Sequence, residues 1–192
     1  MTPEDVLDLF RKSGALLDGH FRLSSGLHSP GYLQCALVLQ YPDRADALGR
    51  AIADRVRGLA PTVVMSPALG GVVIGQEVGR ALGVRALFAE RQDAVLTLRR
   101  GFTVGPRDRV LIVEDVLTTG GSTRETMGVA RAAGGQVVGA SAIIDRSGGK
   151  AHVDVPFHTL VELPLPTYQP DECPLCAEGR PLTKPGSRPA AP

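Results

Sequence analysis

Apolar residues along the chain change between helical spacing and short unbroken runs. Residues 42–58 carry apolar side chains at every third or fourth position, which predicts a helix with one buried face. Further helices are expected at 72–82 and 122–133, and unbroken apolar runs predict strands at 62–65, 84–89, 109–113, 136–144 and 158–163. Strands that alternate with helices, and that are apolar at every position, predict an α/β fold with a mainly parallel central sheet.

The two ends of the chain differ from this pattern. Thr2 and Asp5 have the spacing of a capping box, so a helix is expected from there to about residue 13. Extended pieces are expected at 20–23 and 32–38, around a loop rich in Ser, Gly and Pro. Residues 164–192 hold eight of the fifteen prolines, too many for a regular helix or a central strand. We therefore expect a single domain at 1–163 followed by a Pro-rich C-terminal tail.

Residues 91–109 form a polar segment that interrupts the strand–helix alternation. It contains five arginines against two aspartates and no lysine or histidine. Within it, residues 94–98 and 101–104 are expected to form a hairpin. The arginines indicate either an anion clamp or a solvated basic loop.

Length and composition restrict the classes of protein. The 192 residues are 43% apolar and 21% charged, as in an ordinary globular domain. The net charge of +1 does not favour nucleic-acid binding, and no apolar run approaches the ~20 residues that cross a bilayer. Three cysteines cannot form a disulfide framework, so a cytoplasmic location is expected. The absence of Asn and the excess of Arg over Lys fit either thermal adaptation or a GC-rich genome.

The stretch from 109 to 125 carries the clearest chemistry. An apolar strand ends in Glu114 and Asp115, and a turn of Thr and Gly residues leads into a helix, with Ser122 and Glu125 spaced as a capping box. Ligands of α/β sheets bind at the carboxyl ends of strands, where glycine N–H groups and a helix N-terminus suit a phosphate. Carboxylates repel phosphate and suit sugar hydroxyls. The stretch therefore predicts a site for a phosphorylated sugar.

This stretch, VLIVEDVLTTGGS at 110–122, resembles the sequence motif of the type I phosphoribosyltransferases, and its EDVLTTG form is most similar to the orotate branch. Three further segments are similar to the same family in the expected order: FRLSSGLHSPGYLQC at 21–35, SPALGGVVIG at 66–75 and AIIDRSGG at 142–149. The resemblance implies a mainly parallel central sheet flanked by helices, with a small N-terminal hood at about 15–40.

The resemblance also implies an activity, which is transfer of the 5-phosphoribosyl group from phosphoribosyl pyrophosphate (PRPP) to orotate in UMP biosynthesis. Glu114 and Asp115 would hold the ribose hydroxyls, and Asp115 and Arg91 would be catalytic. The PRPP site would comprise Arg91, Glu114, Asp115, Val116, Leu117, Thr118, Thr119, Gly120, Gly121 and Ser122. Mg²⁺ would be bound with the pyrophosphate, and the protein would be a homodimer.

Orotate would be bound by Thr118 and Arg146, because the planar guanidinium suits an anionic, carbonyl-rich ring. A surface ion pair of Arg146 with Asp145 is the alternative. A purine-base phosphoribosyltransferase and a ligand-sensing regulator on the same fold are the alternative functions. Better-known members have a lysine where Ser24 stands and lysines and a histidine in the mobile loop, where this chain offers only arginines.

The histidines and cysteines predict no metal site in the protein. None of the four histidines has metal-ligand spacing with another. Cys173 and Cys176 form half of a zinc-knuckle pattern, and a closed site would need Cys35 or another subunit. Tail packing or a redox-sensitive dithiol is the favoured interpretation of this pair.

Overall fold

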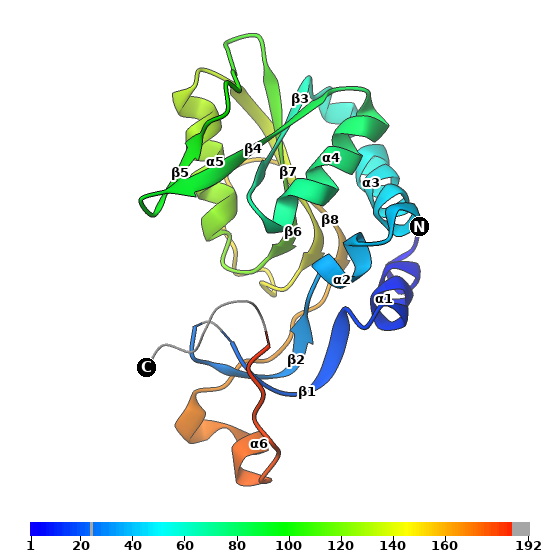
Figure 1. Cartoon of the computed structure of the whole chain (residues 1–192), viewed down its shortest axis with the longest axis vertical. Helices are drawn as coiled ribbons and strands as arrows, with labels where there is room; N and C mark the ends of the chain where they lie inside the picture. The colour runs from blue at the N-terminus through cyan, green and yellow to red at the C-terminus, as the bar shows by residue number, and fades with distance from the viewer. Residues whose placement is uncertain (24, 186–192) are drawn as a thin grey trace.

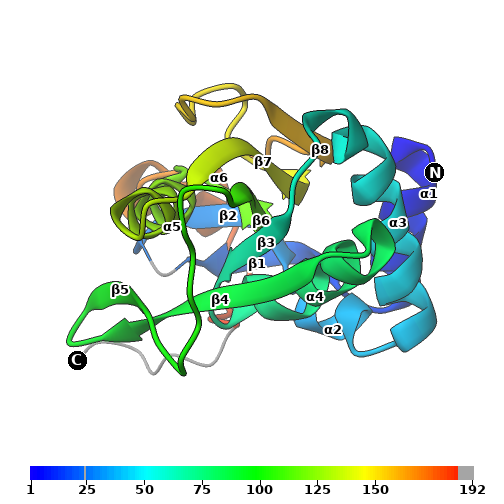
Figure 2. The same ribbon diagram turned by 90° about the horizontal axis from the view of Figure 1, so that it is seen from above.

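The computed structural model describes residues 1–23 and 25–185, so Ser24 and the last seven residues of the tail lie outside it. A six-stranded sheet with the order β5-β4-β3-β6-β7-β8 forms its centre (Figures 1 and 2). The strands are β3 (Val63–Pro67), β4 (Arg85–Gln92), β5 (Val95–Leu98), β6 (Arg109–Leu117), β7 (Gln136–Asp145) and β8 (Phe157–Glu162). All neighbours pair in parallel except β5, which is antiparallel to β4 at one edge. The predicted α/β fold with a mainly parallel sheet is confirmed.

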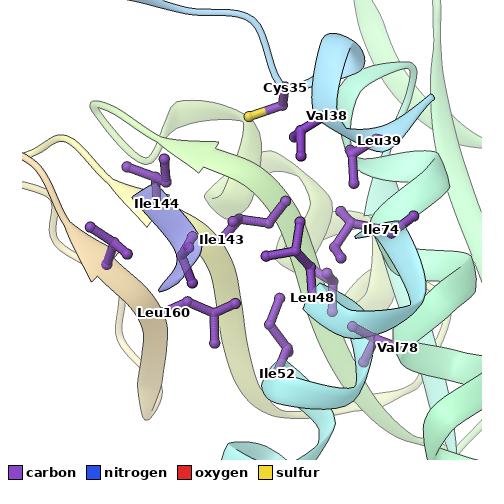
Figure 3. Packing of buried hydrophobic residues seen from close by; sticks show 14 of the residues in the cluster. Cys35, Val38, Leu39, Leu48, Ile52, Ile74, Val78, Ile143, Ile144 and Leu160 are labelled. Atoms are coloured by element: carbon purple, nitrogen blue, oxygen red, sulfur yellow. The ribbon is translucent and has the colours of Figure 1, made fainter. Parts of the chain in front are cut away.

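Helices cover both faces of the sheet, as the unbroken apolar strands predicted. The helices α1 (Pro3–Lys12), α2 (Ala36–Leu39), α3 (Pro42–Val56) and α4 (Gly70–Leu82) contribute to the core on one face, and α5 (Gly121–Ala132) covers the other. The 3-10 turn η1 (Arg57–Leu59) follows α3. Leu111 and Val113 of β6 point into the first core cluster, whereas Val110 and Ile112 point into the second. Figure 3 shows the first cluster, in which Leu48 and Ile52 of α3 pack beside Ile143 of β7.

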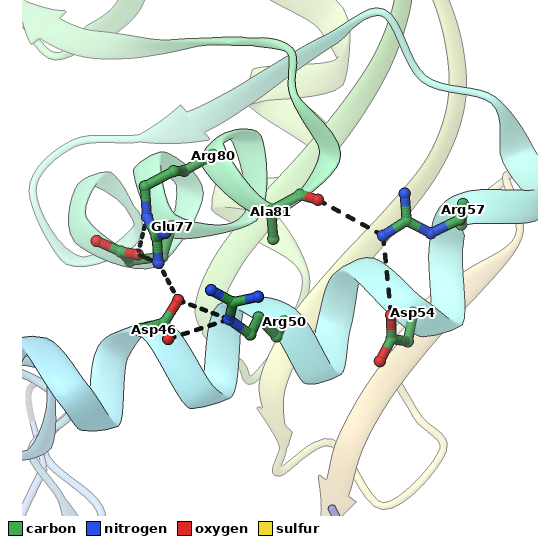
Figure 4. Close-up of polar contacts among 7 residues, drawn as sticks. All are labelled: Asp46, Arg50, Asp54, Arg57, Glu77, Arg80 and Ala81. Carbon is green, nitrogen blue, oxygen red and sulfur yellow. Dashed lines mark hydrogen bonds and ion pairs between the residues drawn. The ribbon is translucent and has the colours of Figure 1, made fainter.

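A group of ion pairs joins α3 to α4 on the outside of this layer (Figure 4). Arg80 of α4 contacts Asp46 of α3 and Glu77 of its own helix, and Asp46 also accepts from Arg50 at 3.0 Å. The pairs are largely exposed, and exposed pairs contribute little to stability. Packing of the apolar faces therefore holds the two helices together.

The N-terminal hood is a separate two-stranded antiparallel sheet of β1 (Leu16–Arg22) and β2 (His28–Leu33). The strand expected at 32–38 is wrong beyond Leu33, because residues 36–39 form the single turn α2. Val38 and Leu39 are buried there against the core, and the Leu39 N–H donates to the Cys35 carbonyl at 2.9 Å. The sequence analysis thus correctly recognised an apolar segment here but assigned it to an extended piece, whereas it forms a helical turn.

The described part of the tail folds around the hood. It contains only two short helical turns, η2 (Pro170–Glu172) and α6 (Pro174–Ala177). Tyr168 pairs with His28 on one side of the hairpin, and Thr183 pairs with Phe21 on the other. The tail thus extends the hood at both of its edges.

The hairpin expected between residues 94–98 and 101–104 does not form, and the first of these segments pairs with β4 instead. β5 pairs with the end of β4, in register Arg91↔Leu96, through a turn at Asp93 and Ala94, which both have positive φ. Residues 101–104 remain a loop because Phe102 and Val104 pack against the second core cluster. In the described chain, no helix is long and apolar enough to cross a membrane.

Candidate active site

A cavity of about 1050 Å³ opens at the carboxyl ends of β6 and β7. Its walls come from the hood, the turn between β6 and α5, the end of β7 and the start of the tail. They are formed by Leu23, Ser25, Leu27, Tyr32, Thr118, Thr119, Arg146, Ser147, Gly148, Lys150, Pro164, Leu165, Pro166 and Thr167. Three predicted site residues, Thr118, Thr119 and Arg146, therefore share one cavity.

The two carboxylates at the end of β6 lie in a poorly solvated environment. Burial, reinforced by the neighbouring charge of Asp115, raises the pKa of Glu114 to about 7, although Thr123 donates a hydrogen bond to its carboxylate. Burial also raises the pKa of Asp115, whose carboxylate accepts from the Val116 N–H at 2.9 Å. The two carboxylates can accept hydrogen bonds from ligand hydroxyls. Their charged forms are disfavoured in the free protein, because water has little access to them.

The turn after β6 has the geometry of an anion site. Gly120 adopts a left-handed conformation with φ 73°, which a side chain would disfavour, and α5 begins at the next residue. Arg124 donates to the carbonyls of Thr119 at 2.9 Å and His152 at 3.0 Å, and so fixes the outside of the turn. The free backbone N–H groups in the first turn of α5, a 12-residue helix, are therefore available to bind an anion at this turn.

The capping box expected at Ser122 and Glu125 is wrong. Gly120 is the N-cap residue, and in the described chain no side chain caps α5. Glu125 instead pairs with Arg91 of β4 at 3.0 Å. A tertiary ion pair thus replaces the local contact that the spacing indicated, and it places Arg91 beside the helix that begins at the anion site.

Arg146 lies directly after β7 and faces the cavity. Its backbone N–H donates to the Leu117 carbonyl at 2.8 Å, which fixes it beside the end of β6. Its guanidinium Nε is buried and has no hydrogen-bond partner within the described chain, and burial lowers its pKa. The alternative, an ion pair with Asp145, does not occur among the described residues; the Asp145 carboxylate accepts from the Ser147 N–H at 2.7 Å. A buried, unpaired guanidinium donor indicates a site for an anionic or carbonyl-rich ligand.

The arginines of 91–109 are not equivalent in the structure. Arg99 and Arg100 both pair with Glu90, at 3.8 and 2.9 Å. Arg109 donates to the carbonyls of Ala60 and Leu59, so it fixes the start of β6 far from the site. The segment at 66–75, which resembles the same family, reaches the site through Gly70, where an added Cβ would lie 2.8 Å from Oδ2 of Asp115.

Tyr32 and Lys150 are among the cavity residues that the sequence reasoning missed. Tyr32 of the hood faces the cavity from β2, and Lys150 lies in the loop after β7. Lys150 is one of only three lysines, which was the one available signal. Tyr32 carried no signal, because its place depends on how the hood folds onto the sheet.

Comparison with known proteins decides the family. A family model described as a phosphoribosyl transferase domain matches residues 37–169, more than half of the chain. The chain belongs to the phosphoribosyltransferase family. The resemblance drawn from the motif at 110–122 is therefore confirmed.

Relatives of this phosphoribosyltransferase are similar over nearly their whole length. It is 52% identical to the orotate phosphoribosyltransferase of Pelotomaculum thermopropionicum and 51% identical to that of Caldanaerobacter subterraneus, in each case over 98% of this chain and 99% of the relative. The crystal structure of orotate phosphoribosyltransferase from Aeropyrum pernix has the same fold, with a TM-score of 0.70 and 23% identity over 82% of this chain and 93% of that one.

Proposed function

We propose that this phosphoribosyltransferase transfers the 5-phosphoribosyl group from PRPP to orotate, with orotidine 5-monophosphate and pyrophosphate as products in UMP biosynthesis. The observation that carries the proposal is the buried, unpaired Nε of Arg146 in a cavity shared with the Thr118–Thr119 turn. The names of relatives about 50% identical over the full chain support the choice of orotate.

The anion site holds the 5-phosphate. Backbone N–H groups of Thr119 to Ser122 and the hydroxyls of Thr118, Thr119 and Ser122 donate to its oxygens. Val116 and Leu117, the last residues of β6, lead directly into this turn. Glu114 and Asp115 accept from the ribose 2- and 3-hydroxyls. The sugar is then fixed at both ends, with its anomeric carbon toward the cavity.

Orotate lies in the part of the cavity formed by Arg146, Thr118 and the hood. The guanidinium donates to the carboxylate or carbonyl oxygens of the ring, and Tyr32 also lines this cavity. A purine lacks the carboxylate that makes this contact charge-assisted. The cavity chemistry therefore favours orotate over adenine.

Reaction at the anomeric carbon needs charge stabilisation more than covalent chemistry. The bond to the pyrophosphate oxygen breaks as the bond to a ring nitrogen forms, and the proton of that nitrogen passes to the leaving pyrophosphate or to solvent. The sugar is cation-like in between, and the carboxylate of Asp115 stabilises it. Arg91, after exchange of its Glu125 partner for ligand, binds the leaving pyrophosphate. The backbone at the start of α4 lies on the same side.

The residues at the end of β6 fit Mg²⁺, because Glu114 and Asp115 offer the hard oxygen ligands that this ion prefers. Bound with the pyrophosphate, Mg²⁺ would neutralise charge on the leaving group. The protein's own part is to hold the sugar hydroxyls beside it. The proposal also includes the homodimer and the cytoplasmic location expected from the sequence, and sedimentation velocity tests the homodimer.

The test is a spectrophotometric assay with PRPP, Mg²⁺ and orotate, run beside an identical assay with adenine. We expect turnover with orotate and none with adenine. Turnover with adenine alone would establish the purine-base function instead. Tight binding of DNA or RNA without turnover of either base would favour the regulator.

A further inference from the structure

Four metal-binding side chains meet in the hood, outside the cavity. They are His20, His28, Cys173 and Cys176, and their ligand atoms all lie within 4.8 Å of one another. His20 Nε2 lies 3.0 Å from His28 Nδ1, 3.5 Å from Cys173 Sγ and 3.8 Å from Cys176 Sγ. Cys176 Sγ lies 3.3 Å from His28 Nδ1. Two imidazole nitrogens and two sulfurs therefore surround one point.

The tail brings the two halves of this cluster together. His20 is on β1 and His28 begins β2, and the loop of the hairpin separates them. The tail pairs with His28 through Tyr168, with hydrogen bonds of 2.9 Å in both directions, and then turns through α6. The N–H of Cys176 donates to the Cys173 carbonyl at 3.1 Å, which directs both thiols to the same side. Cys35, which the sequence analysis named as one residue that could close such a site, lies in the first core cluster instead.

The separations between the ligand atoms are close to those of a tetrahedral zinc site. Zn–S bonds of about 2.3 Å and Zn–N bonds of about 2.05 Å place neighbouring ligand atoms about 3.3 to 3.8 Å apart. Three of the four separations given above, 3.3, 3.5 and 3.8 Å, lie in this range. The distance of 3.0 Å between His20 Nε2 and His28 Nδ1 is slightly shorter, and all the ligand atoms lie within 4.8 Å of one another. Three of the four side chains are buried, with His20, His28 and Cys173 each less than 5% exposed.

A contact behind the cluster orients one ligand. His20 Nδ1 lies 3.0 Å from the Arg180 carbonyl, which is an acceptor only. A hydrogen bond to this carbonyl needs the proton on Nδ1, and in the neutral ring the lone pair of Nε2 then faces the other three ligands. Imidazoles that ligate metals are usually oriented by such a hydrogen bond from the second nitrogen.

We propose that His20, His28, Cys173 and Cys176 bind one structural Zn²⁺ ion. Binding forms two Zn–N and two Zn–S bonds, and both thiols lose their protons to solvent, so the site is neutral and involves no redox step. Four protein ligands leave no open coordination position, which is the pattern of structural rather than catalytic zinc. The site is separate from any Mg²⁺ carried by the pyrophosphate.

The ion would connect the tail to the hood next to the cavity. His28 follows the hood residues Ser25 and Leu27 that line the cavity, and Tyr168 follows the tail residues 164–167 that line it. Both walls thus end at the proposed zinc site. Zinc would stabilise the hood and the tail as one unit, in the same way that it stabilises small domains with few apolar residues.

The first experiment measures zinc in the untagged full chain, purified from zinc-supplemented cells under reducing conditions. We expect about one Zn²⁺ per chain, lost in Cys176→Ser and in His28→Ala. Cys35→Ser and His158→Ala are the matched controls, because these residues lie outside the cluster, and both are expected to keep the metal. Removal of zinc by a chelator should lower Tm, and added Zn²⁺ should restore it.

A second measurement needs no variant. Wild-type protein reconstituted with Co²⁺ should show the visible absorption bands of four-coordinate cobalt and a charge-transfer band from thiolate. The proposal is overturned if the wild type binds neither ion under reducing conditions. It is equally overturned if the variants keep full zinc, or if thiol titration and mass measurement find a Cys173–Cys176 disulfide in protein handled without oxidant.

Discussion

Gly70, the first residue of α4, lies directly against the carboxylate of Asp115 at the end of β6. A Cβ on Gly70 would stand 2.8 Å from Oδ2 and 2.9 Å from Oδ1 of Asp115, closer than van der Waals contact allows. The carboxylate also accepts a hydrogen bond from the Val116 N–H at 2.9 Å. Two strand ends that are distant in sequence therefore set the position of one side chain.

Gly70→Ala should displace the Asp115 carboxylate and lower kcat/KM on the order of tenfold, about 1.4 kcal/mol of transition-state stabilisation. The fold should remain, because the change adds one methyl group at a helix start. Gly128→Ala in α5 is the control, since a Cβ there meets nothing within 4 Å. Equal kinetics for the two variants would show that the Gly70–Asp115 contact does not position the carboxylate.

Asp115→Asn tests the carboxylate itself. The amide keeps the size but is a weaker acceptor for a ribose hydroxyl and carries no charge to stabilise a cation-like sugar, so kcat/KM should fall at least ~10-fold. Steady-state kinetics with PRPP varied measure the change. Asp43→Asn, on the exposed start of α3, should behave as the wild type. Near-normal kinetics of Asp115→Asn would remove this residue from the proposed site.

Glu114 should produce a pH dependence near neutrality. Its pKa is about 7 in the folded chain and 4.5 in the unfolded chain, so the folded state binds the proton more tightly. Protonation therefore favours folding, and the charged form destabilises the fold as pH rises from about 4.5 to 7. Glu114→Gln should raise Tm at pH 8 and change it little at pH 4.5.

Activity should rise with pH over the range in which the Glu114 carboxylate lowers the stability of the fold. The carboxylate form accepts from the ribose hydroxyl, so kcat/KM for PRPP should fall as pH decreases through about 7. Glu114→Gln should lower kcat/KM and abolish this inflection. An inflection that persists in Glu114→Gln would assign it to another group.

Arg146→Ala should raise KM for orotate much more than KM for PRPP. A charge-assisted contact contributes roughly 1.5–3 kcal/mol, about 10- to 150-fold in affinity. Arg11→Ala on α1 is the control, because its guanidinium forms exposed ion pairs with Glu4 and Asp8. Equal increases in both KM values would mean that Arg146 supports the site as a whole and does not bind the base.

The arginine segment is proposed to be mobile without ligand, to close over the pyrophosphate and to act only through charge. Arg91→Ala should reduce kcat, since Arg91 lies beside the anion site, and Arg99→Ala and Arg100→Ala test whether their pairs with Glu90 open in the closed state. Arginine does not titrate near neutral pH, so no variant should move an inflection between pH 6 and 9. Full activity of all three alanine variants would show that the segment is a solvated hairpin that does not bind the pyrophosphate. Rescue of one by lysine would show that a point charge is enough.

The sequence by itself determined the layered α/β architecture and the family. Residues 110–113 are apolar at every position because β6 is covered on both faces, and that information lies in contiguous residues. The acids and the Thr/Gly turn that follow are equally local, because the strand end and the helix start that form the anion site are only a few residues apart.

Tertiary structure alone decided what depends on distant segments. Residues 36–39 form a helical turn instead of a strand because the core accepts Val38 and Leu39 in that form. Glu125 of α5 does not form the predicted capping box and instead pairs with Arg91 of β4. His20 and Cys173 are 153 positions apart, so their spacing carried no signal of a shared site. Only the folding of the tail along both edges of the hood brings them together. Backbone pairing between the tail and the hood fixes the positions of these side chains, although they are far apart in the sequence.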